Sequence, residues 1–400
     1  MNVLEILFWL AVLLIAYSYA GFPALTLLRG VLMRRPYQTG DITPSVTLII
    51  AAHNEADVIE AKLQNVLSLD YPADCLNVVI ASDGSTDGTN EIVQRYVGER
   101  VTLLALPRQG KAPALDAAVK AATGDILVFS DANSMYAPQA IREIVRPFAD
   151  PSVGGVAGNQ VYLDPERGTG GDGEKTYWNF DRLLKEFQSR AGNVTSATGA
   201  IYAIRRELYQ PVIGGVTDDF YISTGVIAQH RRLVFSADAI AYEAVAGETG
   251  KEFNRKVRIT TRGLQAVLSR RELLNPFQHG FYSLQLLSHK VLRRLVVLPL
   301  IVVFVLSPLL WAKGWLCRLA LLGQLAFYGL AALGALLENT RLGQKKPLAI
   351  PYYFCMVNAA CLVAAANIVR GRRIERWDTE RSLPAAETPG TPAMPTDRTI

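Results

Sequence analysis

Long apolar stretches at both ends of the chain enclose a middle region in which apolar and polar residues alternate. Residues 3–28 are almost wholly apolar, with Glu5 as their one charge. Three further apolar stretches follow late in the chain, at residues 295–311, 315–337 and 348–369. About 20 apolar residues suffice to cross the ~30 Å hydrocarbon core of a bilayer. We therefore predict an N-terminal transmembrane helix within residues 1–30 and C-terminal transmembrane segments within residues 295–369.

Positive charges beside the first apolar stretch indicate its orientation. Arg29, Arg34 and Arg35 follow it, and basic residues favour the cytoplasmic side. A cleaved signal peptide is the alternative interpretation, but such peptides begin with a basic segment, which is missing here. We expect a multi-pass protein of the cell (inner) membrane whose middle region is a cytoplasmic domain.

The last apolar stretch carries conflicting signals. With the domain inside, three crossings after it would place the C-terminal end outside. Basic residues that favour the inside nevertheless follow the stretch directly, at Arg370, Arg372, Arg373 and Arg376. We expect a true span, because residues 348–369 are apolar enough to cross. A segment that does not cross, buried among the other helices, is the alternative.

Two other segments have distinct patterns. Residues 275–294 place apolar residues at helical spacing and end in arginines, which is typical of an interfacial amphipathic helix. Residues 377–400 are rich in Pro, Thr, Glu and Ala, and this composition predicts a disordered tail.

The middle region, residues 45–271, alternates short apolar runs with amphipathic stretches. Four runs predict buried strands, at residues 46–52, 76–81, 101–106 and 126–130. Helical spacing between them predicts helices at residues 54–69, 85–97 and 112–122. This alternation predicts an α/β fold with a Rossmann-like, mostly parallel sheet, whose ligands lie beyond the carboxyl ends of the strands.

Composition narrows the choice of partners. The net charge of +5 is small, and acidic residues are spread through the same segments as basic ones, so we expect no nucleic-acid partner. Membrane lipids account for the basic residues beside the apolar stretches. The four cysteines form no CxxC pair, so neither a zinc site nor a disulfide framework is predicted.

Polar clusters follow each of the four predicted strands. They are His53–Glu55, Ser82–Gly88, Arg108–Lys111 and Ser130–Ser134. Any one of them could be a simple turn, because Asp, Asn, Ser and Gly commonly end strands. Four at successive strand ends favour a ligand site instead.

These residues resemble the donor-binding half of family 2 glycosyltransferases, which have the GT-A fold. The similarity rests on Ala51–Glu55, Ala81–Gly88, Gly110–Lys111 and Ser130–Asn133. It covers residues 45–271, and the flanking apolar stretches match membrane-bound members such as polysaccharide synthases and transferases that act on exopolysaccharides or lipid-linked sugars. The resemblance implies a GT-A domain flanked by transmembrane helices, with a nucleotide-diphosphate sugar as donor.

The resemblance also implies roles for the first three clusters. Backbone at Ala52 and His53 would line the nucleobase pocket, and Glu55 would lie near the base or ribose. Asp83 would accept a hydrogen bond from the base. Lys111 would offer positive charge to the nucleotide or its diphosphate.

The fourth cluster holds the family's Asp-x-Asp positions, here Asp131 and Asn133. The resemblance implies that they bind Mg2+ or Mn2+ against the diphosphate, using the hard oxygen ligands that these ions prefer. Asn133 departs from the family pattern, because it offers a neutral oxygen in place of a carboxylate. The metal would then depend more on Asp131 and on the phosphates.

The acceptor side is expected later in the chain. Thr217-Asp218-Asp219 matches the family's Thr-Glu-Asp, and an inverting transfer needs a base for the acceptor hydroxyl. We take Asp219 as that base and keep Asp218 as the alternative. Gly199 and Ala200 would form part of the acceptor floor, where small residues let a sugar approach the backbone.

Three further positions have more than one interpretation. Arg258 matches the arginine of the Gln-x-x-Arg-Trp motif of processive members and would meet the diphosphate, although a basic face against anionic lipid explains it too. Ile259 replaces that motif's tryptophan, which argues against processivity. Trp178 is a candidate for stacking on the acceptor sugar, and a place in the core is its alternative.

The sequence therefore favours an inverting glycosyltransferase that acts on a growing glycan or a lipid-linked acceptor. The alternative within the enzyme class is a processive synthase that also translocates its product. A silent scaffold subunit is opposed by the intact Asp83, Asp131 and Asp219. A transporter is opposed by the lack of paired charges within the apolar stretches.

Overall fold

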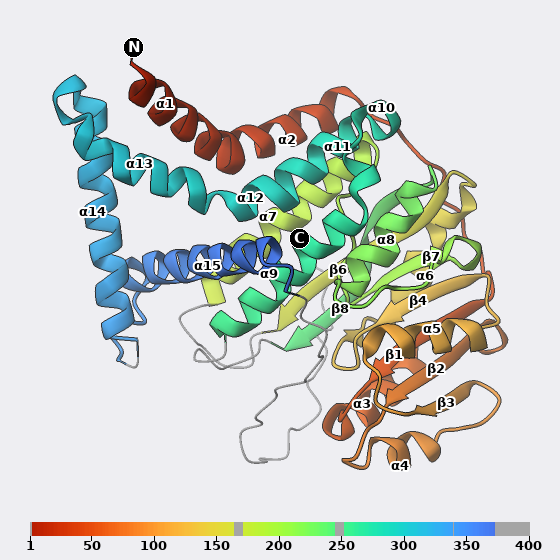
Figure 1. Cartoon of the computed structure of the whole chain (residues 1–400). Helices are drawn as coiled ribbons and strands as arrows, with labels where there is room; N and C mark the ends of the chain where they lie inside the picture. Colours follow the sequence, from red (N-terminus) through yellow and green to blue (C-terminus); the bar gives the residue numbers. More distant parts are fainter. Residues whose placement is uncertain (1, 164–170, 245–251, 339, 373–400) are drawn as a thin grey trace.

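A single eight-stranded sheet forms the centre of the domain in this computed structural model, which describes residues 2–163, 171–244, 252–338 and 340–372 (Figure 1). The sheet order is β3-β2-β1-β4-β7-β6-β8-β5. The strands span β1 Val46–Ala52, β2 Leu76–Asp83, β3 Val101–Leu106, β4 Ile126–Ser130, β5 Met135–Tyr136, β6 Val153–Leu163, β7 Tyr202–Arg205 and β8 Arg232–Ala244.

The first four strands are parallel, as the sequence predicts. The helices that connect them are α3 Ala56–Leu67, α4 Thr89–Gln94 and α5 Lys111–Ala121, followed by α6 Ala140–Val145. Right-handed crossovers of this kind bring the carboxyl ends of β1 to β4 to one edge. The four polar clusters therefore meet at that edge.

Both faces of the parallel half are covered by helices, which explains why β1 is buried at every position. Its even-numbered apolar residues Leu48 and Ile50 pack against α3 and α6, whereas Ile49 and Ala51 pack against α5. Such a strand lacks the alternation of a strand with one solvent face, because both sides lie in a core.

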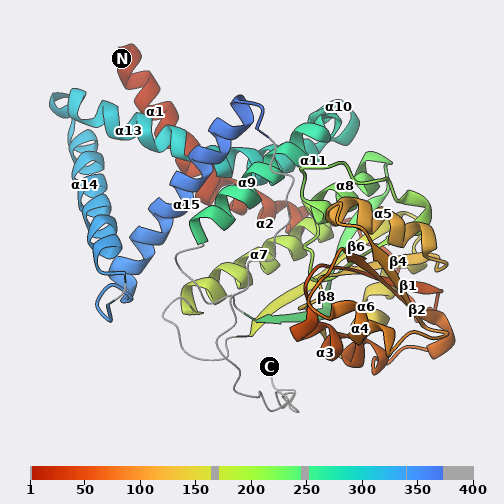
Figure 2. The ribbon, with the colours of Figure 1, turned by 60° about the horizontal axis from the view of Figure 1, so that its bottom comes forward.

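The second half of the sheet is mixed. β7 is antiparallel to both β4 and β6, β6 and β8 are parallel, and the short β5 is antiparallel to β8. Helix α8, Asp218–Ala228, packs on this half and begins with the predicted acid pair. Helix α7, Gly171–Ala191, and helix α9, Glu252–Ser269, lie between the sheet and the apolar helices (Figure 2).

The N-terminal apolar stretch forms one helical run over Val3–Leu32, made of α1 Val3–Ala16, the π-helical turn η1 Tyr17–Gly21 and α2 Phe22–Leu32. Its α2 end packs on α7, where Gly30 leaves room for the Phe187 ring and backbone. The first predicted membrane helix is thus anchored directly to the domain that follows it.

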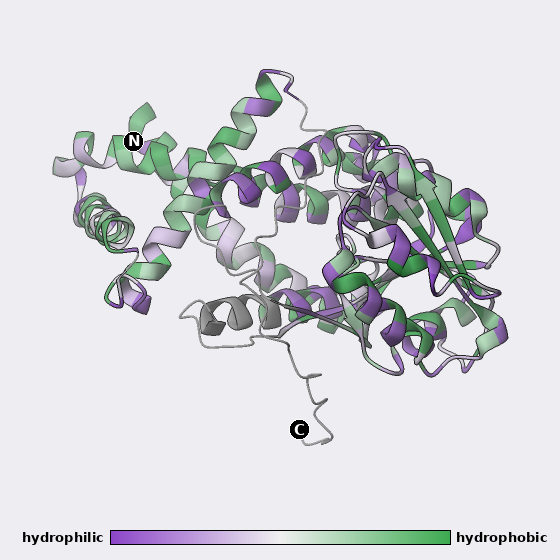
Figure 3. Cartoon of the chain, turned by 90° about the horizontal axis from the view of Figure 1, so that it is seen from below, coloured by the Kyte–Doolittle hydropathy of each residue, from purple (hydrophilic) through white to green (hydrophobic). Residues whose placement is uncertain are grey.

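Among the described residues, three helices are long and apolar enough to cross a membrane: Val3–Leu32, α14 Trp315–Leu336 and α15 Lys346–Val369. A fourth candidate is a pair bent by 50°, Phe281–Leu295 with α13 Val297–Leu309. The hydropathy colours show these apolar helices gathered on one side of the molecule, away from the sheet (Figure 3). Three to four apolar helices therefore indicate a membrane protein, as the sequence predicts.

The segment predicted as one interfacial helix, residues 275–294, is broken instead. It forms α10 Pro276–His279, α11 Phe281–Leu286, the π-helical turn η6 Leu287–Leu292 and the start of α12 Arg293–Leu295. The break falls at Gly280, whose φ of 56° takes it out of the right-handed helical region. Tyr282 and Leu286 are buried in the core of the domain, so this segment docks onto the domain rather than lying free.

The C-terminal helix α15 runs beside α9. The Lys256 ammonium of α9 lies 5.7 Å from the Tyr353 ring, and Gln265 donates to the carbonyl of Arg372, the last residue described, at 2.9 Å. The end of α15 therefore lies next to the domain. The crossing of the membrane by α15 stays a prediction, and the helix is long and apolar enough to make it. The predicted tail, residues 377–400, lies outside the described residues.

Candidate functional site

Two adjacent acids and one lysine form the centre of the site. Asp218 and Asp219 open α8, while Lys111 opens α5 at the carboxyl edge of the sheet. The Lys111 ammonium bridges two carboxylates, with 2.9 Å to Asp131 Oδ1 and 3.0 Å to Asp218 Oδ2. The donor-side and acceptor-side candidates thus meet at one charged group.

The two acids of α8 have opposite electrostatic surroundings. Burial alone would raise the pKa of Asp218, but Lys111 and the Arg262 guanidinium outweigh it and lower that pKa. Burial and the neighbouring Asp218 charge raise the pKa of Asp219 to about 6. One acid therefore stays ionised as an ion-pair partner, and the other has its pKa near 6.

Lys111 responds to the same charges. Burial would lower its pKa, but Asp131 and Asp218 outweigh the burial and raise the pKa far above its usual range. The ammonium is a fixed positive charge at this edge of the sheet.

Asp131 lies directly after β4 and beside the loop that leads into β7. Its N–H donates to the Gly199 carbonyl at 3.1 Å, and Ser130 Oγ donates to the Ala200 carbonyl at 3.4 Å. A Cβ on Gly199 would lie 2.6 Å from Asp131 Oδ2, so only glycine leaves this carboxylate in its place. The predicted acceptor floor and the predicted metal ligand are immediate neighbours.

Asn133 has an acidic partner that the sequence did not reveal. Its Nδ2 donates to Glu243 Oε1 at 2.7 Å, and Gln160 Nε2 donates to the other oxygen of Glu243. Glu243 reaches this place because β8 pairs with β5, two residues after Asn133. No group of three or more His, Cys, Asp or Glu among the described residues forms a closed metal site.

The donor atoms nevertheless suit a hard divalent cation. Asp131, Asn133 and Glu243 all offer oxygen, which Mg2+ and Mn2+ prefer. The Asp131 side chain is 35% exposed, and its Oδ2 lies against Gly199, which has no side chain to cover it. The residues present therefore fit the predicted metal, with the diphosphate completing the ligand set.

Asp83 is engaged by the loop after β3. It is 1% exposed, accepts from the N–H groups of Gln109 (2.7 Å) and Gly110 (2.9 Å), and forms an ion pair with Arg108. In this arrangement the carboxylate organises the loop that carries Lys111. The predicted contact with a nucleobase would require that loop to shift.

The first two polar clusters, His53–Glu55 and Ser82–Gly88, are joined by hydrogen bonds. His53 Nδ1 lies 2.8 Å from the Asp83 carbonyl, and Asn54 accepts from the Thr86 N–H at 2.9 Å. Ala52 is fully buried at the end of β1, and Glu55 is 4% exposed, with its N–H donating to Thr89 Oγ1 at 2.9 Å. These loops form one wall of the edge.

Lys62 supports the loop Asp131–Ser134, which carries the predicted metal ligands and is called the metal loop below. No sequence motif had identified this lysine. The side chain is fully buried on α3, donates to the Ser134 carbonyl and lies 3.8 Å from the Tyr136 ring. Asn65, one turn later, exchanges two hydrogen bonds with the Tyr136 backbone, at 2.9 and 2.8 Å. Burial lowers the pKa of Lys62 to about 7, against the opposing effect of the Asp131 charge. The sequence signal that could have revealed Lys62 is its place, as a charged residue, on the apolar face of a predicted helix.

In the cationic helix α9, the arginine that contacts the acid pair's surroundings is Arg262, whereas the sequence analysis selected Arg258. Arg262 donates to the Val216 carbonyl at 3.0 Å, just before the acid pair, and its charge lowers the pKa of Asp218. Arg258 lies on the same helix, half-buried, and its diphosphate contact stays a prediction. The side chain of Trp178 lies outside the described residues, although its backbone belongs to α7.

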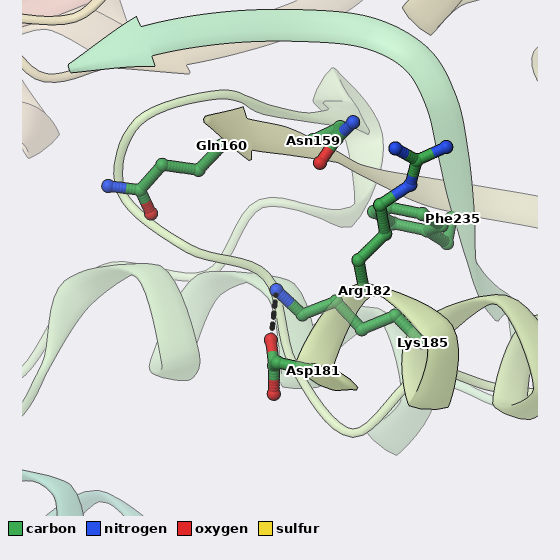
Figure 4. A pocket seen from close by; sticks show the side chains of 6 residues that line it. All are labelled: Asn159, Gln160, Asp181, Arg182, Lys185 and Phe235. Carbon is green, nitrogen blue, oxygen red and sulfur yellow. Dashed lines mark ion pairs between the residues drawn. The ribbon is translucent and has the colours of Figure 1, made fainter. Parts of the chain in front are cut away.

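A separate small pocket lies between α7 and strands β6 and β8 (Figure 4). It is lined by Asn159, Gln160, Asp181, Arg182, Lys185 and Phe235. It has room for about one water molecule, so it cannot hold a sugar nucleotide. Its ion pair, Lys185 to Asp181 at 3.0 Å, becomes relevant below.

Comparison with known proteins agrees with this fold. Residues 47–212 match the model of glycosyl transferase family 2. Poly-beta-1,6-N-acetyl-D-glucosamine synthase of Staphylococcus aureus (strain MSSA476) is 26% identical over 249 residues, 60% of each chain. The synthase of the same name from Staphylococcus epidermidis is 24% identical over 231 residues, 56% of this chain and 55% of its own. The chain thus spans about 60% of the length of the curated relatives it matches.

A solved structure covers more of the chain. A mannosyltransferase from Pyrobaculum calidifontis, in complex with GDP-Man and Mn2+, is similar with a TM-score of 0.67 at 26% identity. The similarity covers 92% of this chain and 100% of that one. It therefore extends beyond the sheet into the apolar helices.

Proposed function

Since this chain is a family 2 glycosyltransferase with the GT-A fold, we propose that it transfers a sugar, with inversion, from a nucleotide-diphosphate sugar. The acceptor is a growing glycan or a lipid-linked sugar at the cytoplasmic face of the cell membrane. The role is in exopolysaccharide or cell-envelope glycan synthesis, which the Staphylococcus relatives support by name.

The observation that carries this proposal is the contrast between the two acids of α8. A general base works best when its pKa lies near the operating pH, and the pKa of Asp219 is raised to about 6. Asp218 is held ionised by Lys111, 3.0 Å away. Asp219 accepts the proton of the acceptor hydroxyl, and Asp218 fixes the lysine.

The donor end of the reaction lies on the other side of Lys111. Asp131, Asn133 and Glu243 would hold Mg2+ or Mn2+. The bound metal would stabilise negative charge on the leaving diphosphate. Lys111 adds a positive charge there without needing to move far, because it already contacts Asp131 at 2.9 Å.

A panel of nucleotide sugars tests the proposal. Detergent-solubilised full-length chain is incubated with each donor, a divalent metal and a membrane lipid extract, and released nucleoside diphosphate is measured. We expect release with one donor or a few. Absence of release with every donor would contradict the proposal.

A processive synthase that also translocates its product is the second candidate, because the Staphylococcus relatives are polymer synthases. Ile259 argues for short products, since it offers no aromatic platform and is 43% exposed on α9. Brief reactions should therefore add one or a few sugars. Long polymer that forms before short products accumulate would favour the synthase.

A further inference from the structure

Lys290 is a cation that the mechanism so far leaves unused. It lies in the π-helical turn η6 and is half-buried. Its ammonium makes no hydrogen bond or ion pair within the described ranges and lies 5.9 Å from the Phe220 ring, with the charges of Asp181 and Asp219 acting on it from farther away. Taking an ammonium out of water without an anion is costly, so such a group marks a place where an anion can bind.

The position of Lys290 is next to the proposed base. Its charge is close enough to Asp219 to lower the pKa of that acid, and Phe220 follows Asp219 in the chain. Lys111 forms an ion pair with the other acid, Asp218, and belongs to the donor side of the site. Lys111 therefore contacts Asp218 directly, whereas Lys290 lies beside the Asp219–Phe220 part of α8, which we take as the acceptor side.

The surroundings of Lys290 carry excess positive charge. Asp181 is already paired with the Lys185 ammonium at 3.0 Å, and the His289 imidazole lies 3.9 Å from it. Arg294, one turn after Lys290, lies against Gly263 of α9, where a Cβ would overlap its guanidinium. Asp181 is thus paired with Lys185, and among the described residues no carboxylate lies within ion-pair distance of Lys290, which leaves its ammonium available to a ligand.

Lys290 also lies close to the membrane level. The same helical segment continues through α12 into the apolar helix α13, whose first residue is seven positions later. Seven helical residues advance the chain by about 10 Å. A phosphate at the head of a membrane lipid is the anion most accessible at that depth.

We propose that Lys290 binds the phosphate of a lipid-linked acceptor and so places the acceptor hydroxyl beside Asp219. This rests on the proposed function and chooses the lipid-linked class of acceptor over a neutral glycan. The ligand is a membrane lipid whose phosphate or diphosphate carries the sugar to be extended. The donor diphosphate stays on the Lys111 side.

The test measures binding and kinetics of full-length protein in neutral phosphatidylcholine nanodiscs. Lys290→Met should weaken binding of a fluorescent polyisoprenyl phosphate about 10- to 100-fold, which is the worth of a charge-assisted hydrogen bond. It should raise KM for the polyisoprenyl diphosphate-linked sugar similarly and leave nucleoside diphosphate binding unchanged. Lys290→Arg should restore most of the lipid binding.

Lys345→Met is the matched control, because it removes an exposed lysine beside an apolar helix away from the acids. Unchanged lipid-phosphate binding in Lys290→Met, or an equal loss with a neutral oligosaccharide acceptor, would overturn the proposal. Nanodiscs with anionic phospholipid separate the two lipid sources. Competition by phosphatidylglycerol as strong as that by polyisoprenyl phosphate would assign Lys290 to bulk lipid and overturn the acceptor assignment.

The lipid-binding measurement needs no sugar transfer. If wild type releases no nucleoside diphosphate from any donor but binds the lipid phosphate through Lys290, the proposed function fails and the site stands. If release occurs but Lys290 has no effect on the lipid, the site fails and the function stands.

Discussion

The loops on the donor side and the residues around α8 on the acceptor side satisfy their charges in different ways. On the donor side, Asp83 accepts from two backbone N–H groups and pairs with Arg108, and the metal loop rests on Lys62 and Asn65. On the acceptor side, Asp219 has a raised pKa and Lys290 has no ion-pair partner in the described structure. The charged groups of the donor side therefore have partners within the protein before a ligand binds.

The difference indicates where ligand binding provides the missing contacts. A network whose charged groups are paired is rigid, and rigidity keeps metal and donor in a fixed geometry. Charges left without partners lower stability, and they persist where a substrate makes use of them. We therefore expect substitutions on the donor side to affect binding of metal and donor, and those on the acceptor side to affect turnover and acceptor use.

The largest expected effect comes from breaking the link between the two sides. Asp131→Ala removes the only carboxylate at the predicted Asp-x-Asp positions and one partner of Lys111. Turnover should be abolished, EDTA should do the same to wild type, and Mn2+ binding in the presence of nucleoside diphosphate, measured by electron paramagnetic resonance, should be lost. Asp74→Ala, an exposed acid at the opposite end of β2, is the control. Full activity in EDTA would remove the metal from the mechanism.

The next effect isolates the acceptor side. Asp219→Asn keeps the shape of the side chain but cannot accept a proton. Turnover should fall by about 10²–10⁴-fold, the usual worth of general base catalysis. Nucleoside diphosphate binding, measured by calorimetry, should stay near normal. A larger loss in Asp218→Asn would assign the base to Asp218.

A smaller effect tests the support of the donor side. Lys62→Met removes the hydrogen bond to the Ser134 carbonyl beneath the metal loop. The metal concentration for half-maximal activity should rise about 10-fold, as for other residues that orient metal ligands. The melting temperature should change little, because relief of a buried charge offsets the lost hydrogen bond. Lys120→Met, exposed on α5, should leave the metal response unchanged.

The smallest effect is a shift along the pH axis. Because the pKa of Asp219 is raised to about 6, the base is protonated and inactive below that pH. The acid limb of kcat/KM should therefore have its midpoint near pH 6, well above the usual range of an aspartate. Asp218→Asn should move the midpoint to lower pH, because it removes the neighbouring negative charge that raises the pKa. An acid limb near pH 4 in wild type would contradict the assignment.

Strand positions were predictable because burial on both faces leaves a direct apolar signature, and β1, β3 and β4 begin and end where the sequence places them. The helix starts were not. The sequence predicts helices from residues 54 and 85, but α3 begins at Ala56 and α4 at Thr89. Asn54 and Ser85 bond to each other's loops across the sheet edge, and these tertiary hydrogen bonds replace the local caps.

Tertiary contacts also limit how much of the candidate site could be predicted from the sequence. Asp131 and Asp219 stand in recognisable motifs, whereas Glu243 and Lys290 come from segments with no motif at all. Glu243 reaches Asn133 only because β8 pairs with β5. Lys290 reaches Asp219 only because the chain after Gly280 folds back onto the domain. Such residues are chosen by topology, which a linear pattern does not record.

The bridge made by Lys111 has a consequence for the order in which ligands bind. While its ammonium neutralises Asp131 and Asp218, it competes with any divalent cation for the negative charge of the Asp131 carboxylate, of which it holds Oδ1. Lys111 can release Asp131 at little cost only when another anion is present to receive it, and a nucleoside diphosphate is such an anion. Cation and nucleotide should therefore enhance each other's affinity, and by linkage the enhancement is the same in both directions. The resting enzyme would thus ignore free metal and respond to the metal–nucleotide complex.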